Sequence, residues 1–273
     1  MNHATPPILV DTHTHIFLEE FDEDIDDLLH RAHQAGVVYT LLPNLDTSSL
    51  PSLLNFCDKR TGEAFPMIGL HPSYVKEDYR DQLSSLQSAL SQSPERFIAI
   101  GEIGLDYHWS TDFKAEMNDA LRTQLRWALE YDLPVSLHAR DAVPDVINAI
   151  REVGEDRLRG VFHSFTGTEG ELREIIDTLP RFYVGVNGVV TFKNSHLPEI
   201  FERLAPPERL LIETDAPYLA PTPKRGKRNE PSYLTYILHK LSEIYFLSME
   251  EMAQTLLRST MNLFHLPSPV STP

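Results

Sequence analysis

The chain has 273 residues, 41% of them hydrophobic, which fits one large α/β domain with a substantial core. Its formal net charge of −16 argues against nucleic-acid binding through a broad basic surface. Its single cysteine, Cys57, excludes an internal disulfide and a cysteine-based zinc cluster, so a bound metal would need histidine and carboxylate ligands.

The amino-terminal residues MNHATPPILVD contain neither a basic segment nor a long apolar segment. No apolar run in the chain approaches the roughly 18 residues that a membrane-spanning helix needs. We therefore expect a cytoplasmic protein without membrane contact, and take a monomer as the default state.

Eight short apolar segments alternate with amphipathic segments along the chain. They predict strands at 8–13, 37–44, 65–71, 97–106, 133–140, 160–165, 181–188 and 209–216. The segments 21–36 and 113–132 have helical periodicity, and the first carries acidic residues in its first turn and ends at Gly36, as helices often do. Two further helical stretches follow the last strand, at 231–246 and 248–264.

Near-continuous apolar strands, each followed by a helix, predict a parallel sheet, and eight such units predict a closed (β/α)8 TIM barrel. The alternative is an open doubly wound sheet, in which the first turn after a strand would carry a glycine-rich phosphate loop. Here that turn reads DTHTHIFLEE and contains no glycine, which favours the barrel. We expect one domain over 1–265 and a flexible, Pro/Ser-rich tail over 266–273.

Ionisable residues gather at the predicted carboxyl ends of the strands, where barrels of this type place their active sites. The pair His13 and His15 projects from one face of the first strand, because side chains two residues apart point the same way. The other strand-end residues of this kind are His71, Glu102, Asp106, His138, Arg140, His163, Glu213 and Asp215.

Burying so many ionisable groups at one rim would be costly without a compensating cation, so the pattern predicts a metal centre. A ligand set of four imidazoles and two carboxylates drawn from these residues would suit Zn, Mn, Fe or Ni, whereas Mg would prefer more oxygen ligands. A carboxylate between two sub-sites could bridge two divalent ions. The remaining histidines are interpreted as solvated, with His108 left open: His30, His33, His196, His239 and His265.

The chain resembles the TatD-type metal-dependent hydrolases, deoxyribonuclease-like members of the amidohydrolase barrel superfamily. The motifs that carry the resemblance are DTHTH, GLHP, GEIGLDYH, LHAR, FHSFTG, ETDAPYLAP and KRNEP, and they span essentially the whole chain. The resemblance implies two divalent metal ions bridged by Glu102. It assigns one ion to His13, His15 and Asp215, and the other to His138 and His163.

Two positions depart from the family pattern. Ser73 follows GLHP where a histidine is frequent, and HSFTG replaces the commoner HCFSG. The second change leaves His163 untouched. The first puts in doubt any role for a second histidine in that loop.

The resemblance implies hydrolysis of DNA phosphodiesters, with trimming from an end as the expected mode. A metal-activated water would attack, Asp215 would orient it and accept its proton, and Glu102 would act with it as the second catalytic carboxylate. Further candidates for substrate contacts are His71, Arg140, Arg225 and Arg228, the last two in the basic run KRGKR at 224–228.

Three alternatives stay open at this point. The basic run is also compatible with a solvated loop. The same metal chemistry could attack a carbonyl carbon, for example in an aminoacyl ester on tRNA. A barrel that binds metal without catalysis and serves as an interaction module is a third possibility.

Overall fold

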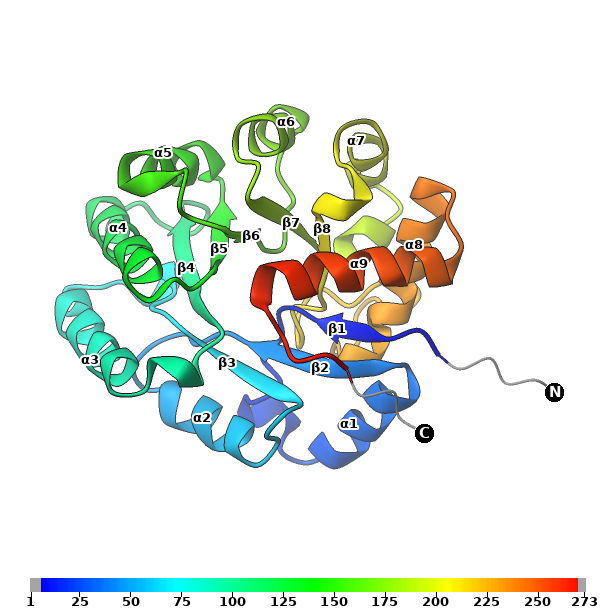
Figure 1. The fold of residues 1–273 in the computed structure, drawn as a ribbon, viewed down its shortest axis with the longest axis horizontal. Coiled ribbons are helices and arrows are strands. Elements are labelled where there is room, and N and C mark those ends of the chain that lie inside the picture. The colour runs from blue at the N-terminus through cyan, green and yellow to red at the C-terminus, as the bar shows by residue number, and fades with distance from the viewer. Residues whose placement is uncertain (1–5, 270–273) are drawn as a thin grey trace.

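The computed structural model describes residues 6–269, and its eight parallel strands are surrounded by helices (Figure 1). Each strand pairs in parallel with the next one along the chain. The predicted (β/α)8 barrel is therefore confirmed. The strands are β1 (Leu9–Asp11), β2 (Val37–Leu42), β3 (Ala64–Ile68), β4 (Ala99–Asp106), β5 (Val135–Arg140), β6 (Gly160–Phe162), β7 (Phe182–Val186) and β8 (Leu210–Ile212).

The barrel closes where β8 meets β1. Isolated hydrogen bonds rather than a continuous ladder join these two strands within residues 6–269. The backbone N–H and hydroxyl of Thr12 both donate to the Ile212 carbonyl, at 3.2 and 3.0 Å. Beside them, the buried Asp11 carboxylate accepts from the backbone N–H and the hydroxyl of Thr214, at 2.9 and 2.6 Å. We call this junction the β8–β1 seam.

The helices that follow β1 to β7 pack around the outside of the sheet, and two more follow β8. The last helix, red in Figure 1, lies across one open end of the barrel and contacts β1 and β8. The helices are α1 (Ile25–Gln34), α2 (Leu50–Asp58), α3 (Tyr79–Gln92), α4 (Lys114–Tyr131), α5 (Val143–Gly154), α6 (Glu169–Thr178), α7 (Leu197–Leu204), α8 (Leu234–Tyr245) and α9 (Met249–Phe264). None of the described helices is both long enough and apolar enough to span a bilayer.

Most strands are shorter than predicted, because their final residues leave the sheet and turn towards the barrel mouth. The segment predicted at 160–165, for example, pairs only over 160–162. The first predicted helix, 21–36, is also shorter: α1 begins at Ile25, after a separate 3-10 turn at Glu19–Phe21. Gly36 ends this unit with φ +90°, and a Cβ there would lie 2.1 Å from the Pro7 carbonyl oxygen, so only glycine fits.

An apolar cluster fills the amino-terminal half of the barrel interior. Val10, Met67, Val161 and Leu211 contribute to it from four strands, and the end of α9 packs against the same cluster. Leu266, the first residue of the predicted tail, is buried in this cluster. Residues 270–273 lie outside the described residues, so the flexible tail stays a prediction.

Candidate metal centre

The inward-facing side chains change from apolar to polar along each strand. On β6, Val161 belongs to the apolar cluster, and His163 follows two residues later. On β8, Leu211 is in the cluster, and Glu213 and Asp215 follow at intervals of two. Because residues two apart share a face, the column of side chains that builds the core continues into the polar centre at the carboxyl end.

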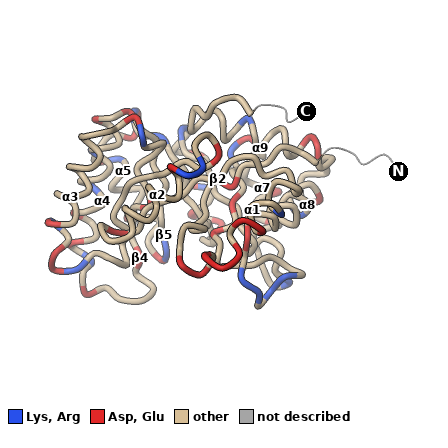
Figure 2. The backbone as a smooth tube through the Cα atoms, turned by 90° about the horizontal axis from the view of Figure 1, so that it is seen from below, with Lys and Arg blue, Asp and Glu red and all other residues tan. Residues whose placement is uncertain are grey.

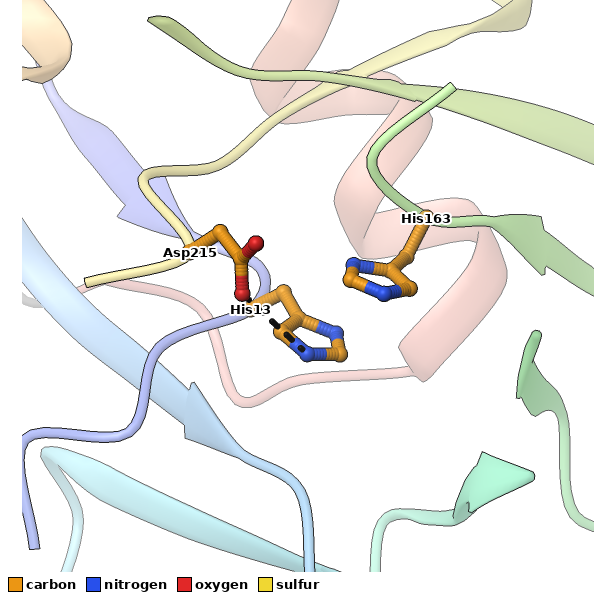
Figure 3. A group of neighbouring side chains, drawn as sticks. All are labelled: His13, His163 and Asp215. Carbon is orange, nitrogen blue, oxygen red and sulfur yellow. Dashed lines mark ion pairs between the residues drawn. The ribbon is translucent and has the colours of Figure 1, made fainter. Parts of the chain in front are cut away.

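Glu102 lies in the middle of this centre and is only 2% exposed. Its Oε2 is 3.1 Å from His13 Nε2 and 3.7 Å from His15 Nε2. Asp215 completes this side, with Oδ1 at 3.6 Å from His15 Nε2 and 4.0 Å from His13 Nε2. Figure 3 shows Asp215 and His13 facing each other beside His163. One oxygen of Glu102 is thus directed at the pair of histidines from β1.

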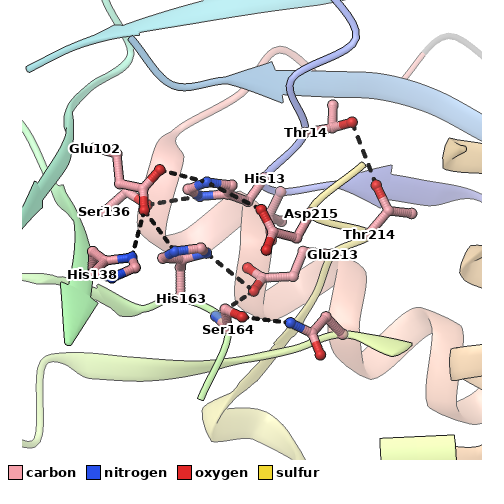
Figure 4. Close-up of polar contacts among 12 residues, drawn as sticks. His13, Thr14, Glu102, Ser136, His138, His163, Ser164, Glu213, Thr214 and Asp215 are labelled. Carbon is pink, nitrogen blue, oxygen red and sulfur yellow. Dashed lines mark hydrogen bonds and ion pairs between the residues drawn. The ribbon is translucent and has the colours of Figure 1, made fainter. Parts of the chain in front are cut away.

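The other oxygen of Glu102 faces a different set of imidazoles (Figure 4). Glu102 Oε1 lies 3.1 Å from His71 Nε2, 2.9 Å from His138 Nδ1 and 2.8 Å from His163 Nε2. The two carboxylate oxygens therefore face different imidazoles, while His163 also lies within ligand distance of His13 and Asp215. A carboxylate in this position is able to bridge two cations.

Asp215 adopts a left-handed backbone conformation with φ 58°. Its backbone N–H donates to the His13 carbonyl at 2.9 Å, which ties it to the loop carrying the histidine pair. A non-glycine residue in this region costs conformational energy and persists where the surroundings hold it, as they often do at functional sites. Three groups of residues each bring their candidate ligand atoms within 4.8 Å of one another. They are His13, His163 and Asp215; His13, His15 and Glu102; and His71, Glu102 and His138.

Unpaired buried nitrogens support a cation at this centre. His163 is buried, and neither of its ring nitrogens makes a hydrogen bond with another described residue, although Nε2 lies 2.8 Å from Glu102 Oε1. His15 Nδ1 is also buried without a partner among residues 6–269. Such orphaned polar atoms are costly in a protein interior. His13 and His138 do hydrogen-bond to Glu102, at 3.1 and 2.9 Å. The nitrogens of His163 and His15 Nδ1 that lack such partners fit a divalent metal as their partner.

The carboxylates and imidazoles of the centre shift one another's pKa values. Burial alone would raise the pKa of Glu102, but the imidazoles of His163, His71 and His13 lower it well below its usual range. Burial lowers the pKa of His13. Burial alone would also lower the pKa of His163, but the Glu102 and Glu213 carboxylates outweigh burial and raise that pKa. The ion-pair contacts of Glu102 and Asp215 within residues 6–269 are all with histidines. No lysine or arginine in this range therefore neutralises the two carboxylates.

Three residues around the centre have contacts that the sequence did not assign to them. Asp106 and Glu213 were predicted at the strand ends without a role, and Ser136 was not predicted. Ser136 Oγ lies 3.2 Å from His13 Nδ1, and Asp106 Oδ2 lies 2.9 Å from His138 Nε2. Ser136 stands two residues before His138 on β5, so strand periodicity could have placed it on the same face. Each holds the second nitrogen of a candidate ligand, the arrangement that fixes imidazole orientation at metal sites.

Glu213 is the third such residue. Its carboxylate accepts a hydrogen bond from the Ser164 backbone N–H, and its Oε1 lies 3.5 Å from His163 Nδ1. It packs directly on Gly185 of β7, where a Cβ would lie 2.5 Å from Glu213 Oε2. Its position two residues before Asp215 was visible in the sequence. What was not visible is that its carboxylate turns towards His163.

His71 was predicted to contact substrate, and the structure places it among the candidate ligands through Glu102 Oε1. Its Nδ1 accepts a hydrogen bond from the Ser73 backbone N–H at 3.1 Å. The backbone of residue 73 orients the imidazole, so a serine at this position preserves that contact.

The three predicted arginines lie in different surroundings. Arg140 lines the cavity that contains the metal centre, and its guanidinium lies 5.2 Å from the Trp109 ring centroid. Arg225 lines a neighbouring cavity. Arg228 lines neither: it forms an ion pair with Asp24 at 2.6 Å. Figure 2 shows a protruding loop with basic residues in blue close to a red acidic stretch near α1.

The metal centre opens into a cavity of about 600 Å³. Three aromatic side chains that line it are solvent-exposed: Tyr74 at 40%, Trp109 at 75% and Tyr218 at 55%. Only one other large hydrophobic side chain among residues 6–269, Phe246, is similarly exposed. Exposed aromatic surface is therefore concentrated at this mouth, as expected where a ligand covers it.

Comparison with known proteins identifies the family of the chain. The family model described as TatD related DNase matches residues 10–265. The metal-dependent hydrolase YabD of Bacillus subtilis is 34% identical over 259 residues, covering 95% of this chain and 100% of the relative. The 3'-5' ssDNA/RNA exonuclease TatD of Cronobacter turicensis is 35% identical over 241 residues, covering 86% of this chain and 89% of the relative.

A solved structure of a TatD homologue has the same fold as this chain. The crystal structure of YjjV, a TatD homologue from Escherichia coli, superposes with a TM-score of 0.87 at 30% identity, covering 95% of this chain and 98% of the other. The match of the family model over nearly the whole chain and the identity to these relatives lead to one conclusion. The chain belongs to the TatD-related DNase family of metal-dependent hydrolases.

Proposed function

We propose that this protein hydrolyses phosphodiester bonds in DNA, releasing nucleotides from an end, at the metal centre around Glu102. The observation that carries the proposal is the cavity mouth, where the exposed rings of Tyr74, Trp109 and Tyr218 line the same cavity as Glu102. Stacking of bases on aromatic side chains is worth about 1–3 kcal/mol per base. The printed name of the Cronobacter relative, an exonuclease, supports the same substrate class.

Two divalent ions would be held by the residues on either side of Glu102. The first set is His13, His15 and Asp215, and the second is His138 and His163, with His71 as an added candidate. When bound, such ions activate a water molecule and neutralise charge that develops on the phosphate oxygens.

Asp215 has the geometry of a proton acceptor. Its Oδ1 faces His15 and His13, whereas its Oδ2 makes no hydrogen bond with another described residue. Oδ2 is therefore available to orient the attacking water and accept its proton, a role that typically contributes about 10²–10⁴-fold to the rate.

Arg140 would bind a phosphate at the cavity wall. Within residues 6–269 its guanidinium has no ion-pair partner, and the Trp109 ring lies beside it. A guanidinium of this kind can bind phosphate oxygens in a bidentate manner. Hydrolysis of a carboxylic ester, such as an aminoacyl-tRNA, would use the same metal centre. In that substrate only the bases at the tRNA end could stack on the exposed aromatic side chains, so a DNA strand accounts for them better.

The proposal is tested by metal analysis followed by an activity screen. The purified protein is stripped with a chelator, reloaded separately with Mn, Zn, Mg, Fe or Ni, and assayed on end-labelled linear DNA, circular single-stranded DNA and an aminoacyl-tRNA. We expect chelation to abolish cleavage, metal to restore it, and the circular substrate to resist. The Glu102→Ala variant is the matched control and should bind less metal. Full activity with no detectable metal, or turnover of aminoacyl-tRNA alone, contradicts the proposal.

A further inference from the structure

A second cavity, of about 360 Å³, adjoins the metal cavity. Thr166 and Val189 line both. The second cavity is walled mainly by the chain after β7, including Lys193, and by Arg225 from the loop after β8. Its lining, among the described residues, contains no aspartate or glutamate, although the chain carries 40 acidic against 24 basic residues. We call this cavity the basic subsite.

The two cations of the basic subsite are not neutralised by the described part of the chain. Neither Lys193 nor Arg225 forms an ion pair with any residue between 6 and 269. Arg228, only three residues beyond Arg225, shows the contrast, because its guanidinium binds both carboxylate oxygens of Asp24 at 2.7 and 2.6 Å. The loop thus directs one arginine to an internal partner and leaves the other available for a ligand.

Arg225 is held in place by stacking. Its guanidinium lies 3.7 Å from the Phe192 ring centroid. An arginine stacked on an aromatic face keeps the N–H donors at its edge free for a planar or tetrahedral anion. The contact favours one orientation of the guanidinium before a ligand arrives, which lowers the entropic cost of binding.

The loops that build the basic subsite are tied to one another. The Thr222 backbone N–H donates to Thr191 Oγ1 at 2.8 Å, which joins the chain after β8 to the chain after β7. His196 Nε2 lies 2.9 Å from the Gly167 carbonyl oxygen and joins the loop after β6. Gly188 permits the close approach of the loop after β8, because a Cβ there would lie 2.1 Å from the Leu219 carbonyl oxygen. The shape of the subsite is thus set by contacts among the loops that follow β6, β7 and β8.

We propose that the basic subsite binds a second phosphate group of the substrate, next to the one that is cleaved. The proposal rests on the proposed function. Phosphate sites in (β/α)8 barrels recur at the loops after strands seven and eight, which supply Lys193 and Arg225 here. The second phosphate is either the next diester of the strand or a terminal phosphomonoester. Both present the same charged oxygens.

The test compares Lys193→Gln, Arg225→Gln and the double variant with Lys227→Gln. Lys227 is the matched control, since it is exposed, belongs to the same basic run and lines neither cavity. With the metal-loaded enzyme and a trinucleotide such as dTpdTpdT, the double variant should raise KM about tenfold, equivalent to about 1.4 kcal/mol. The kcat should stay within twofold, and Lys227→Gln should behave as wild type.

Shorter substrates distinguish the two sources of the phosphate. The dinucleotide dTpdT has only the scissile phosphate, so its KM should not respond to the double variant. A response of dTpdTpdT alone assigns the subsite to the next diester, and a response of 5'- or 3'-phosphorylated dTpdT alone assigns it to a terminal phosphomonoester. An equal loss on dTpdT, no loss on any substrate, or an equal loss in Lys227→Gln overturns the proposal.

A binding measurement separates this proposal from the proposed function. The anisotropy of a fluorescent single-stranded oligonucleotide is titrated with protein in excess chelator, where no turnover is expected. The log–log plot of binding constant against salt should be less steep for a variant than for the wild type. The difference in slope should be about 0.7 for each phosphate that the variant no longer neutralises. If the wild type cleaves no DNA but the slope falls, the subsite stands and the proposed function fails. If the wild type cleaves DNA and neither KM nor slope changes, the subsite is wrong.

Discussion

At its amino-terminal end the barrel is filled by apolar side chains and covered by α9, whereas at its carboxyl-terminal end the same strands present buried carboxylates and imidazoles. A single residue separates the two chemistries at the end of β8, where Leu211 belongs to the apolar cluster and Glu213 to the polar centre. The apolar end gains free energy from burial, and the polar end needs a ligand to offset its desolvation. Substitutions at the two ends should therefore change different measurements.

The largest effect is expected at the polar end. Asp215→Asn keeps the shape of the side chain and one oxygen but removes the proton acceptor. We expect kcat to fall by about 10²–10⁴-fold with folding unaffected. Steady-state kinetics on metal-loaded protein, with metal content measured in the same sample, provides the test. A kcat within about threefold of wild type would show that Asp215 is not the general base.

At the apolar end, Leu211→Ala should act on stability alone. Leu211 is fully buried in the apolar cluster, and such truncations cost about 2–5 kcal/mol. Urea unfolding monitored by circular dichroism measures the change. Metal affinity and the kcat of the folded protein should remain within about twofold of wild type. A clear loss of metal affinity would mean that the two ends are coupled through β8.

Glu213→Gln tests a residue of the polar end that touches a candidate metal ligand without being one. The substitution removes the charge beside His163 and preserves the volume of the side chain, so metal affinity should fall by about 10–100-fold. Competition with a chromophoric chelator gives the affinity, and urea unfolding of the metal-free protein gives the stability. If affinity is unchanged while the metal-free protein is destabilised, Glu213 serves the packing on Gly185 and does not position His163.

The smallest effect is expected at the rim, outside both regions. Arg228→Gln removes a half-exposed ion pair with Asp24, and such pairs contribute about 0–1 kcal/mol. The KM for a DNA substrate should not change, because Arg228 lines neither cavity. Thermal unfolding and kinetics are measured with Arg225→Gln alongside. A rise in KM equal to that of Arg225→Gln would restore Arg228 as a substrate contact, as its sequence position had indicated.

The parts of the molecule that were predictable follow from local patterns. The alternation of apolar and amphipathic segments indicates eight strands, and the residues at their ends identify the polar centre because a barrel brings all strand ends together. His71 shows the limit of this reasoning. The sequence places it at the correct rim, but its depth, 3.1 Å from Glu102, depends on how the loop after β3 turns.

Other features depend on contacts between distant segments and could not be read from either segment alone. Arg228 and Asp24 are 204 residues apart, and nothing near either residue indicates their pairing. The basic subsite combines Lys193, in a stretch without any recognised motif, with one arginine of a run whose members are otherwise alike in sequence. Charge patterns show which residues are basic, but the tertiary structure decides which of them remain unpaired.

The β8–β1 seam predicts a structural role for a metal bound at this centre. Isolated hydrogen bonds join these strands, and the candidate ligands stand on both sides of the seam, with His13 and His15 following β1 and Asp215 following β8. A cation bound by these residues together would cross-link the first and last strands of the barrel. Local opening at the seam would then be linked to metal release. On metal loading, amide hydrogen exchange should slow more in β1 and β8 than in β5 and β6. A uniform change in exchange would argue against a cross-link between β1 and β8.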